Sequence, residues 1–237
     1  MEEGKFKRSR SLLGDAAYKK LASVRVAVFG VGGVGGWCAE ALLRTGVRRL
    51  AIIDDDTVAE SNINRQRQAT PLTIGRPKVE VLRDILLEIA PEAEVSAISK
   101  RYTPETSEDF NGILFDCDYV VDAIDSVGCK AHLIQKCVMG VDGRTVPILS
   151  SMGAALRTDP TKVRIAPFHK ISGDGLAKAL RNRFRKAGLP LPMHACAYSE
   201  ELPDGKPGET MGSIMPVTCA FGMALASLVV QSVRKEV

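Results

Sequence analysis

The sequence has 237 residues, of which 45% are hydrophobic and 25% are charged, and its formal net charge is +4 at pH 7. These proportions are typical of a soluble globular protein and exclude a disordered or fibrous chain, while the length allows one large α/β domain. The modest positive charge permits contact with nucleic acid without requiring it. Because residues 1–10 are charged and no uninterrupted apolar run follows them, we expect no signal peptide, no lipid anchor and a cytoplasmic protein.

In chain order, the first predicted element is a short helix over residues 12–24. The apolar side chains expected to pack it against the sheet are Leu12, Leu13, Ala16 and Leu21. Residues 24–35, VRVAVFGVGGVG, then predict a buried strand that runs into a glycine-rich turn and opens a second helix. That second helix is expected to stop at Gly46.

The glycine-rich turn has the spacing of a nucleotide phosphate site. Gly30, Gly32 and Gly35 match the pattern GxGxxG, in which the first glycine allows a tight turn and the second lets phosphate approach the backbone. The third glycine lets the helix pack closely on the strand, and the amide groups at the start of that helix attract an anion. A merely tight strand-to-helix turn is the alternative at this point.

The next predicted strand, over residues 48–56, ends in Asp54, Asp55 and Asp56, and an acid at this place suits a ribose hydroxyl. A polar loop of about 20 residues follows, and loops of that length are usually functional. A helix is predicted from Pro77 to Pro91. The remaining predicted elements of the sheet region are a strand at 95–98, a strand at 119–123, a helix at 126–139, and strands at 145–154 and 162–168.

Because parallel strands bind ligands outside their carboxyl ends, Asp54, Asp56 and Asp125 are expected to converge at one edge of the sheet. A basic helix is predicted at 174–186, and its charge fits either a solvated face or an RNA-phosphate surface. Residues 188–212 predict a long crossover loop, partly mobile. The uncharged stretch 214–230 is short and interrupted by polar residues, which favours a buried C-terminal helix over a membrane span, so we expect no membrane insertion.

Seven sequence blocks occur together in a fixed order: LLG near the start, FGVGGVGGWCAEAL, IIDDDTVAESNINRQ, GRPKVE, YVVDAIDSV, ILSSMGA and YSEE. With these blocks the chain resembles the ubiquitin-activating-type adenylating superfamily and, within it, the tRNA threonylcarbamoyladenosine dehydratase family, over roughly residues 6–235. The resemblance implies an α/β fold, a Rossmann-like doubly wound, mostly parallel sheet with helices on both faces. It also implies a single ThiF-type adenylation domain over residues 1–237. Its parts would be an N-terminal helical arm (1–23), a nucleotide-binding core (24–170), and a final part (171–237) with the basic helix, the crossover loop and the C-terminal helix.

The resemblance also implies a site for ATP. The residues it would place on the nucleotide are Gly30, Gly32, Gly33, Asp54, Asp56, Asn62, Asn64, Arg65, Gln66, Lys78, Asp125 and Ser126. Asp54 would hold the ribose, Asn64, Arg65 and Lys78 would meet the phosphates, and Asp125 would bind Mg²⁺, with Asp56 a weaker contributor. The implied catalytic residues are Asp125, Arg65, Lys78 and Arg8, and Arg8 would reach into the site of a partner subunit of a homodimer, with Arg10 as the fallback. Ser126 stands where the sulfur-carrier branch has asparagine, which fits the tRNA branch.

The implied substrate is tRNA carrying threonylcarbamoyl-adenosine, which would be cyclised with loss of water at the expense of ATP. Attack of a carboxylate on the α-phosphorus brings anions together, so cations such as Arg65, Lys78 and Mg²⁺ are what this chemistry needs. The simpler alternatives are that Asp125 caps the following helix and that Arg65 forms a loop salt bridge.

Three other functions stay open at this point. The first is adenylation of the C-terminus of a ubiquitin-like sulfur carrier, with carrier or sulfur-transfer proteins as partners. The second is an NAD-dependent oxidoreductase, and the third is a non-catalytic nucleotide-binding scaffold. No CxxC pair is present, so we expect no structural zinc.

The six cysteines are expected to be mostly buried thiols, with Cys196 considered as a thioester or persulfide nucleophile. The three histidines, His132, His169 and His194, are expected to form ordinary hydrogen bonds, because they lack the spacing of metal ligands.

Overall fold

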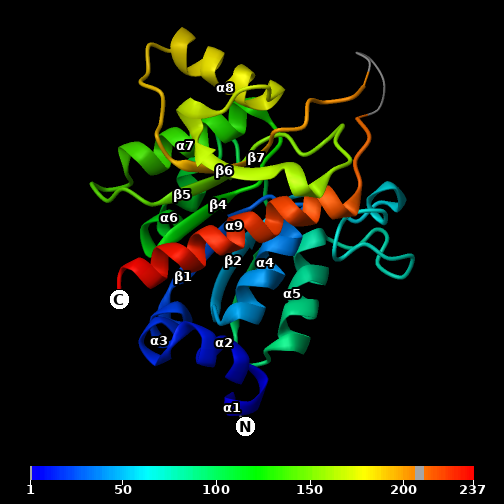
Figure 1. Cartoon of the computed structure of the whole chain (residues 1–237), viewed down its shortest axis with the longest axis vertical. Helices are drawn as coiled ribbons and strands as arrows, with labels where there is room; N and C mark the ends of the chain where they lie inside the picture. Colours follow the sequence, from blue (N-terminus) through cyan, green and yellow to red (C-terminus); the bar gives the residue numbers. More distant parts are fainter. Residues whose placement is uncertain (1, 206–210) are drawn as a thin grey trace.

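The computed structural model describes residues 2–205 and 211–237 and contains one seven-stranded sheet covered by helices (Figure 1). The strands are β1 (Arg25–Phe29), β2 (Arg49–Ile53), β3 (Glu94–Ile98), β4 (Tyr119–Asp122), β5 (Ile148–Ser151), β6 (Val163–Pro167) and β7 (Ala195–Ser199). The α-helices are α1 (Glu2–Lys5), α2 (Lys7–Leu13), α3 (Asp15–Ser23), α4 (Gly35–Thr45), α5 (Lys78–Ile89), α6 (Asn111–Asp116), α7 (Val127–Met139), α8 (Gly175–Lys186) and α9 (Met215–Lys235). Short 3₁₀ turns lie at Glu60–Asn62, Ser107–Phe110, Pro160–Lys162 and Phe168–Lys170.

The strand order is β3-β2-β1-β4-β5-β7-β6, and every neighbouring pair is parallel except β6 with β7. From β1 the chain passes to β2 and β3 on one side and then crosses to β4 on the other side. The carboxyl ends of β1 and β4 therefore form the switch point at which open α/β sheets bind ligands. The predicted doubly wound, mostly parallel fold is confirmed.

The sheet separates two apolar cores, one on each face, and strand β1 contributes side chains to both. Val26 and Val28 face the core under α4, α5 and α9, whereas Ala27 and Phe29 face the core under α6, α7 and α8. Side chains alternate along a strand, so a strand buried on both faces is apolar throughout, as in parallel sheets. Figure 1 shows α9 lying across the sheet beside α4, with α8 at the opposite end of the molecule from α1.

The N-terminal arm differs from the single helix predicted over 12–24. Gly14, with a backbone φ of 82°, separates α2 from α3, so the helical phase does not continue through it. As a result Leu12 is 81% exposed and Ala16 is also exposed, and the prediction that these two pack on the sheet was wrong. Leu21 is buried in the core, as predicted.

The predicted loop 188–212 contains a strand that the sequence analysis missed. β7 pairs with β5 on one side and with β6 on the other, so Cys196 lies inside the sheet and not in a loop. Part of the prediction of a mobile loop falls on residues 206–210, which lie outside the described residues.

The C-terminal helix α9 is the one helix of the described chain whose length and apolarity would allow a membrane span. However, Val217, Phe221, Leu225 and Val229 recur at helical spacing and are fully buried in the core against α4 and the sheet. Their burial confirms the prediction of a buried C-terminal helix.

Candidate functional site

A cavity of about 880 Å³ lies at the carboxyl ends of β1, β2, β4 and β5, where the switch point predicts a ligand. Its volume falls in the range of small-molecule and cofactor sites. The cavity brings together every residue predicted to contact the nucleotide except Asn64. These residues come from the glycine turn, the end of β2, the loop after it, the start of α5 and the end of β4, so the site depends on the adjacent strands β2, β1 and β4.

The glycine turn lies against the end of β4, at one wall of the cavity. Gly30 has a φ of 83°, and a Cβ there would lie 2.8 Å from the carbonyl oxygen of Ala123. A Cβ at Gly35 would overlap the carbonyl oxygen of Gly30, so α4 can begin here only with glycine. At Gly32, by contrast, a Cβ would meet only the Gln66 amide at 3.7 Å, which leaves the backbone accessible from the cavity. The three glycines thus have the distinct roles that their spacing predicts.

Asp54 follows β2 and stabilises the glycine turn. Its Oδ2 accepts a hydrogen bond from the Val31 amide at 2.8 Å, and its Oδ1 accepts one from the Asp56 amide at 2.9 Å. Burial raises the pKa of the Asp54 carboxyl, while the Asp56 amide, the Lys78 ammonium and the Val31 amide oppose that rise. Because a carboxylate has about four acceptor positions, Asp54 keeps capacity for hydroxyl groups of a ligand.

The cations in the cavity wall are held in place by neighbouring groups. The Nζ of Lys78, a residue only 5% exposed at the start of α5, forms an ion pair with Asp56 Oδ2 at 2.6 Å. Arg65 donates from its guanidinium to the Ser61 carbonyl and to Asn64 Oδ1, both at 2.9 Å. Neither bond of Arg65 is a salt bridge, so the alternative of a loop salt bridge was wrong for the contacts among the described residues.

Asp125 is exposed and lines the cavity, one residue before Ser126, which is the N-cap residue of α7. No side-chain hydrogen bond caps α7, so the alternative in which Asp125 acts as a helix cap was wrong. Across the cavity, the carboxylate oxygens of Asp54, Asp55 and Asp56 lie within 4.8 Å of one another. The cavity therefore offers carboxylate oxygens, the ligand type that Mg²⁺ prefers.

Two predicted residues lie outside the cavity. Asn64 donates to the Ser213 carbonyl at 2.8 Å, which ties the loop after β2 to the segment before α9. Arg8 is exposed on α2, in the N-terminal arm, and is not among the residues that line the cavity. Arg10, the fallback for Arg8, instead forms a two-pronged ion pair with Asp15.

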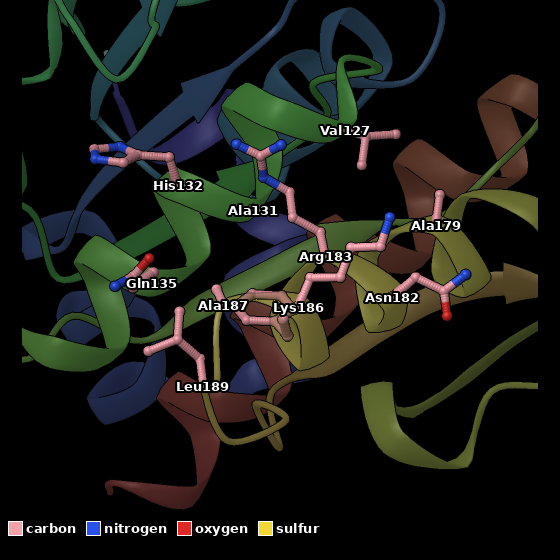
Figure 2. A pocket seen from close by; sticks show the side chains of 11 residues that line it. Val127, Ala131, His132, Gln135, Ala179, Asn182, Arg183, Lys186, Ala187 and Leu189 are labelled. Atoms are coloured by element: carbon pink, nitrogen blue, oxygen red, sulfur yellow. The ribbon is translucent and has the colours of Figure 1, made fainter.

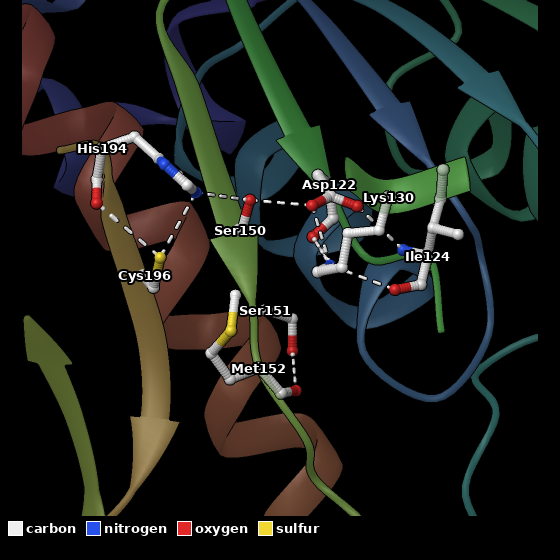
Figure 3. A network of polar contacts seen from close by, with 8 residues as sticks. All are labelled: Asp122, Ile124, Lys130, Ser150, Ser151, Met152, His194 and Cys196. Carbon is white, nitrogen blue, oxygen red and sulfur yellow. Dashed lines mark hydrogen bonds and ion pairs between the residues drawn. The ribbon is translucent and has the colours of Figure 1, made fainter. Parts of the chain in front are cut away.

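A buried ion pair that was not predicted from the sequence lies directly beneath the site. Asp122 at the end of β4 and Lys130 on α7 are both fully buried, with Lys130 Nζ 2.8 Å from Asp122 Oδ2 (Figure 3). Lys130 also donates to the carbonyl oxygens of Asp122 and Ile124, which fixes the segment that leads to Asp125. Burial raises the pKa of Asp122, and Lys130 and the Ser150 hydroxyl act against it. A charged residue inside the apolar run YVVDAI was the signal that could have found this pair.

The polar network continues from Asp122 into β5 and β7. Ser150 Oγ donates to Asp122 Oδ2 at 2.7 Å, and His194 Nε2 lies 2.9 Å from Ser150 Oγ and 3.4 Å from Cys196 Sγ (Figure 3). His132 Nδ1 forms a 3.0 Å hydrogen bond with the Tyr102 hydroxyl. The predicted hydrogen-bonding roles are thus confirmed for His132 and His194.

The cysteines behave as buried thiols. All are buried apart from Cys219, which is partly exposed. Burial raises the pKa of Cys196, and this side chain is fully buried in β7. A nucleophile needs an accessible thiolate, so the structure does not support Cys196 as a thioester or persulfide site.

A second buried pair, also missed, joins the far wall of the cavity to α8. Arg157 Nη2 lies 3.0 Å from Asp174 Oδ2, and both residues are 3% exposed. Asp174 also accepts hydrogen bonds from the Gly153 amide at 3.1 Å and, as the N-cap of α8, from the Ala177 amide at 2.8 Å. The loop after β5 and the start of α8 therefore form one rigid wall.

The comparisons with known proteins agree with this geometry. The model of the ThiF family matches residues 6–236. The chain belongs to the ThiF family. It is 41% identical over 198 residues to the tRNA threonylcarbamoyladenosine dehydratase of Bacillus subtilis, an alignment that spans 84% of this chain and 75% of that protein.

Solved structures place this ThiF-family chain in the same branch. Crystal structures of the Escherichia coli tRNA N6-threonylcarbamoyladenosine dehydratase TcdA in complex with AMP and with ATP superpose with TM-scores of 0.91 and 0.90 at 31% and 32% identity. Each match covers 99% of this chain and 95% of that one. The molybdopterin-synthase adenylyltransferase of Salmonella typhimurium is 32% identical, but over only 59% of this chain and 52% of that protein.

Proposed function

We propose that this protein is an ATP-dependent tRNA-modifying enzyme that activates the carboxylate of threonylcarbamoyl-adenosine in tRNA and cyclises it with loss of water. The observation that carries the proposal is the cavity in which an open glycine turn, two cations and Asp125 meet at the switch point. The similarity to dehydratases over most of the chain, including one whose crystal structure contains ATP, supports the same conclusion.

The residues of the cavity suit the parts of ATP. The backbone of Gly30, Gly32 and Gly33 would contact the nucleotide, since only glycines leave this wall open. Asp54 would accept the ribose hydroxyls, and Asn62 and Gln66, both buried in the cavity wall, would add polar contacts. Gln66 Oε1 has no hydrogen-bond partner among the described residues, which leaves it for a ligand donor.

The charges of the site suit attack on a phosphate. Lys78 and Arg65 would bind the phosphates, with Lys78 leaving Asp56 and Arg65 leaving the Ser61 carbonyl as ATP enters. Both cations then offset the negative charge that accumulates when a carboxylate approaches the α-phosphorus. Asn64 lies next to Arg65 and accepts from it, so Asn64 would act by positioning that guanidinium.

Mg²⁺ fits the carboxylates of the cavity, because the exposed side chains of Asp125 and Asp56 both line it. Asp125 would hold the ion, with Asp56 as a weaker ligand and Ser126 beside it. When bound, the ion neutralises phosphate charge. The proposed reaction does not require zinc.

The reaction has two steps. A threonyl carboxylate oxygen attacks the α-phosphorus, the bond to the β-phosphate oxygen breaks, and pyrophosphate leaves, which gives an acyl-adenylate. A carbamoyl atom of the same side chain then attacks the activated carbonyl, loses its proton and expels AMP as the ring closes. The second step is intramolecular and gains from proximity, so no enzyme nucleophile is needed. The buried state of Cys196 agrees with this scheme.

The active unit would be a cytoplasmic homodimer in which Arg8 of one subunit reaches the ATP site of the other. Arg8 is exposed and forms no ion pair with a described residue, so its guanidinium is available to a second subunit. Lys5 and Arg10, on the same arm, are paired with Glu92 and Asp15 and are less suited to this role.

Isotope exchange between pyrophosphate and ATP tests the proposal. We expect exchange that depends on tRNA carrying threonylcarbamoyl-adenosine. Asp125→Ala should lower turnover by about 10² or more while ATP still binds, because the lost group acts mainly on the reacting phosphates. The matched control is Asp116→Ala, which changes another exposed aspartate at the end of α6 and should leave turnover unchanged.

The alternative is adenylation of a ubiquitin-like sulfur carrier, which the partial match to the molybdopterin-synthase adenylyltransferase favours. Exchange that required a small carrier protein and ignored tRNA would establish that alternative. Binding of ATP with no exchange on any carboxylate would instead identify a non-catalytic scaffold, and binding of NAD without ATP would identify an oxidoreductase.

A further inference from the structure

A second cavity of about 490 Å³ forms a groove between α7 and α8, beside the ATP-sized cavity (Figure 2). Val127 and Ala179 line both cavities, so the groove runs directly into the wall of the candidate active site. A hydrogen bond also connects the two cavities, because the Tyr102 hydroxyl in the active-site cavity lies 3.0 Å from Nδ1 of His132 in the groove. The groove therefore lies where the next unit of a polymer could bind when one unit occupies the active site.

The surface along the groove is basic because of α8. This helix presents five cations, Lys178, Arg181, Arg183, Arg185 and Lys186. Arg181 donates to the Ile171 carbonyl at 2.8 Å, whereas the other four have no ion pair with any described carboxylate. Some other surface cations are paired, for example Arg76 with Asp84 at 2.8 Å, but no carboxylate of the described residues neutralises these four cations of α8. The positive charge of α8 is thus left for an external anion.

The charge of α8 is not explained by the stability of the helix alone. Arg183, Arg185 and Lys186 lie in its last turn, where cations favour the helix dipole by about 0.3–1 kcal/mol. Lys178, however, lies just after the first turn of α8, where a cation gains nothing from the dipole. The helix dipole therefore does not account for the charge of Lys178.

The groove itself has the make-up of a nucleotide subsite. Val127, Ala131 and Leu189 supply an apolar lining, and Arg183 and Lys186 extend from α8 in the same direction over it (Figure 2). The Arg183 guanidinium carbon lies close to α7, 4.0 Å from where a Cβ on Gly128 would be. An apolar lining accommodates the face of an unstacked base, and arginine and lysine bind the attached phosphate.

We propose that the groove between α7 and α8, with the basic face of α8, binds nucleotides of the RNA that flank the base presented to the ATP cavity. This inference rests on the proposed function, since it places the remainder of the same tRNA. Lys178, Arg183, Arg185 and Lys186 bind phosphates, and the groove holds one unstacked base next to the target. An acidic protein bound to the same face is the alternative that the test below separates.

The experiment measures the affinity of the full-length protein for a labelled anticodon stem-loop RNA across a range of salt concentrations. For single-stranded RNA, the slope of log K against log salt becomes less steep by about 0.7 for each phosphate contact that is removed. Arg183→Gln with Lys186→Gln should therefore reduce the slope by about 1.4 and weaken binding by about 25-fold at 0.1 M salt. The exchange Arg183→Lys with Lys186→Arg keeps the charge and should preserve the slope.

The matched control is Arg234→Gln with Lys235→Gln. This pair removes the same charge from the last turn of α9, which lies far from α8 (Figure 1), and should leave the slope unchanged. All variants should bind ATP with the affinity of the unmodified protein, because none of the changed residues lines the ATP cavity.

An unchanged slope in the α8 variant, or an equal loss in the α9 control, would overturn the assignment of this surface. The assignment would also be overturned if the α8 variant kept RNA binding but lost the ability to form a dimer or to bind an acidic protein. Failure of the proposed function is distinguishable, because then the unmodified protein itself would not convert tRNA. If the protein converts tRNA and the α8 variant keeps its slope, only the surface assignment fails.

Discussion

Replacing Lys130 by methionine tests whether the buried pair with Asp122 holds the floor of the active site. The change keeps most of the volume of the side chain but leaves the Asp122 carboxylate fully buried without its cation. Removing one partner of a buried pair costs about 3–5 kcal/mol. Since a domain of this kind is stable by only about 5–15 kcal/mol, the variant should still fold with a much lower urea midpoint.

The stability of Lys130→Met should be compared with that of the double variant Lys130→Met with Asp122→Asn. It removes the uncompensated charge, so it should be more stable than Lys130→Met alone. The control Lys20→Met removes a cation from a surface pair with Glu236, whose side chains are 46% and 47% exposed, and should cost about 0–1 kcal/mol. A cost below 1 kcal/mol for Lys130→Met, or no recovery in the double variant, would refute the reasoning.

Three further predictions follow from contacts near the site. Burial lowers the pKa of His194 to about 3, so between pH 6.5 and 3 this side chain takes up a proton in the unfolded chain but not in the folded one, and the native protein loses stability as pH falls. In urea titrations over this range, His194→Gln should lose up to ~1.4 kcal/mol less stability per pH unit than the unmodified protein. Equal losses in the two proteins would contradict this. Gly35→Ala should cost about 1–3 kcal/mol in thermal unfolding through overlap with Gly30, whereas Gly112→Ala, which meets nothing within 4 Å, should not destabilise. Cys196→Ala should keep turnover of modified tRNA, because this thiol is fully buried. Loss of turnover in this variant would instead support a thiol nucleophile.

The sequence predicted the elements of the site whose roles depend on local geometry. Gly30 and Gly35 were identified from spacing alone, because a tight turn and a close helix contact can be met only without a Cβ. Asp54 and Asp125 were placed at one edge because Asp54 directly follows β2, Asp125 lies three residues after the end of β4, and parallel strands end at the same edge.

The missed features depend on contacts between distant segments. Lys130 was not singled out, since nothing local shows that its side chain turns inward to the end of β4. β7 was taken for a loop because four of its five residues are small and it follows a proline-rich stretch, and only pairing with β5 and β6 makes it a strand. Leu12 was misplaced because the helix was predicted to continue through Gly14, which interrupts it with a φ of 82°.

The most direct measurement is nucleoside mass spectrometry of tRNA carrying threonylcarbamoyl-adenosine after incubation with the purified protein, ATP and Mg²⁺. The account predicts that this nucleoside becomes lighter by one water, that AMP and pyrophosphate form in equal amounts, and that Asp125→Ala prevents all three changes. A nucleoside of unchanged mass in the presence of bound ATP would contradict it.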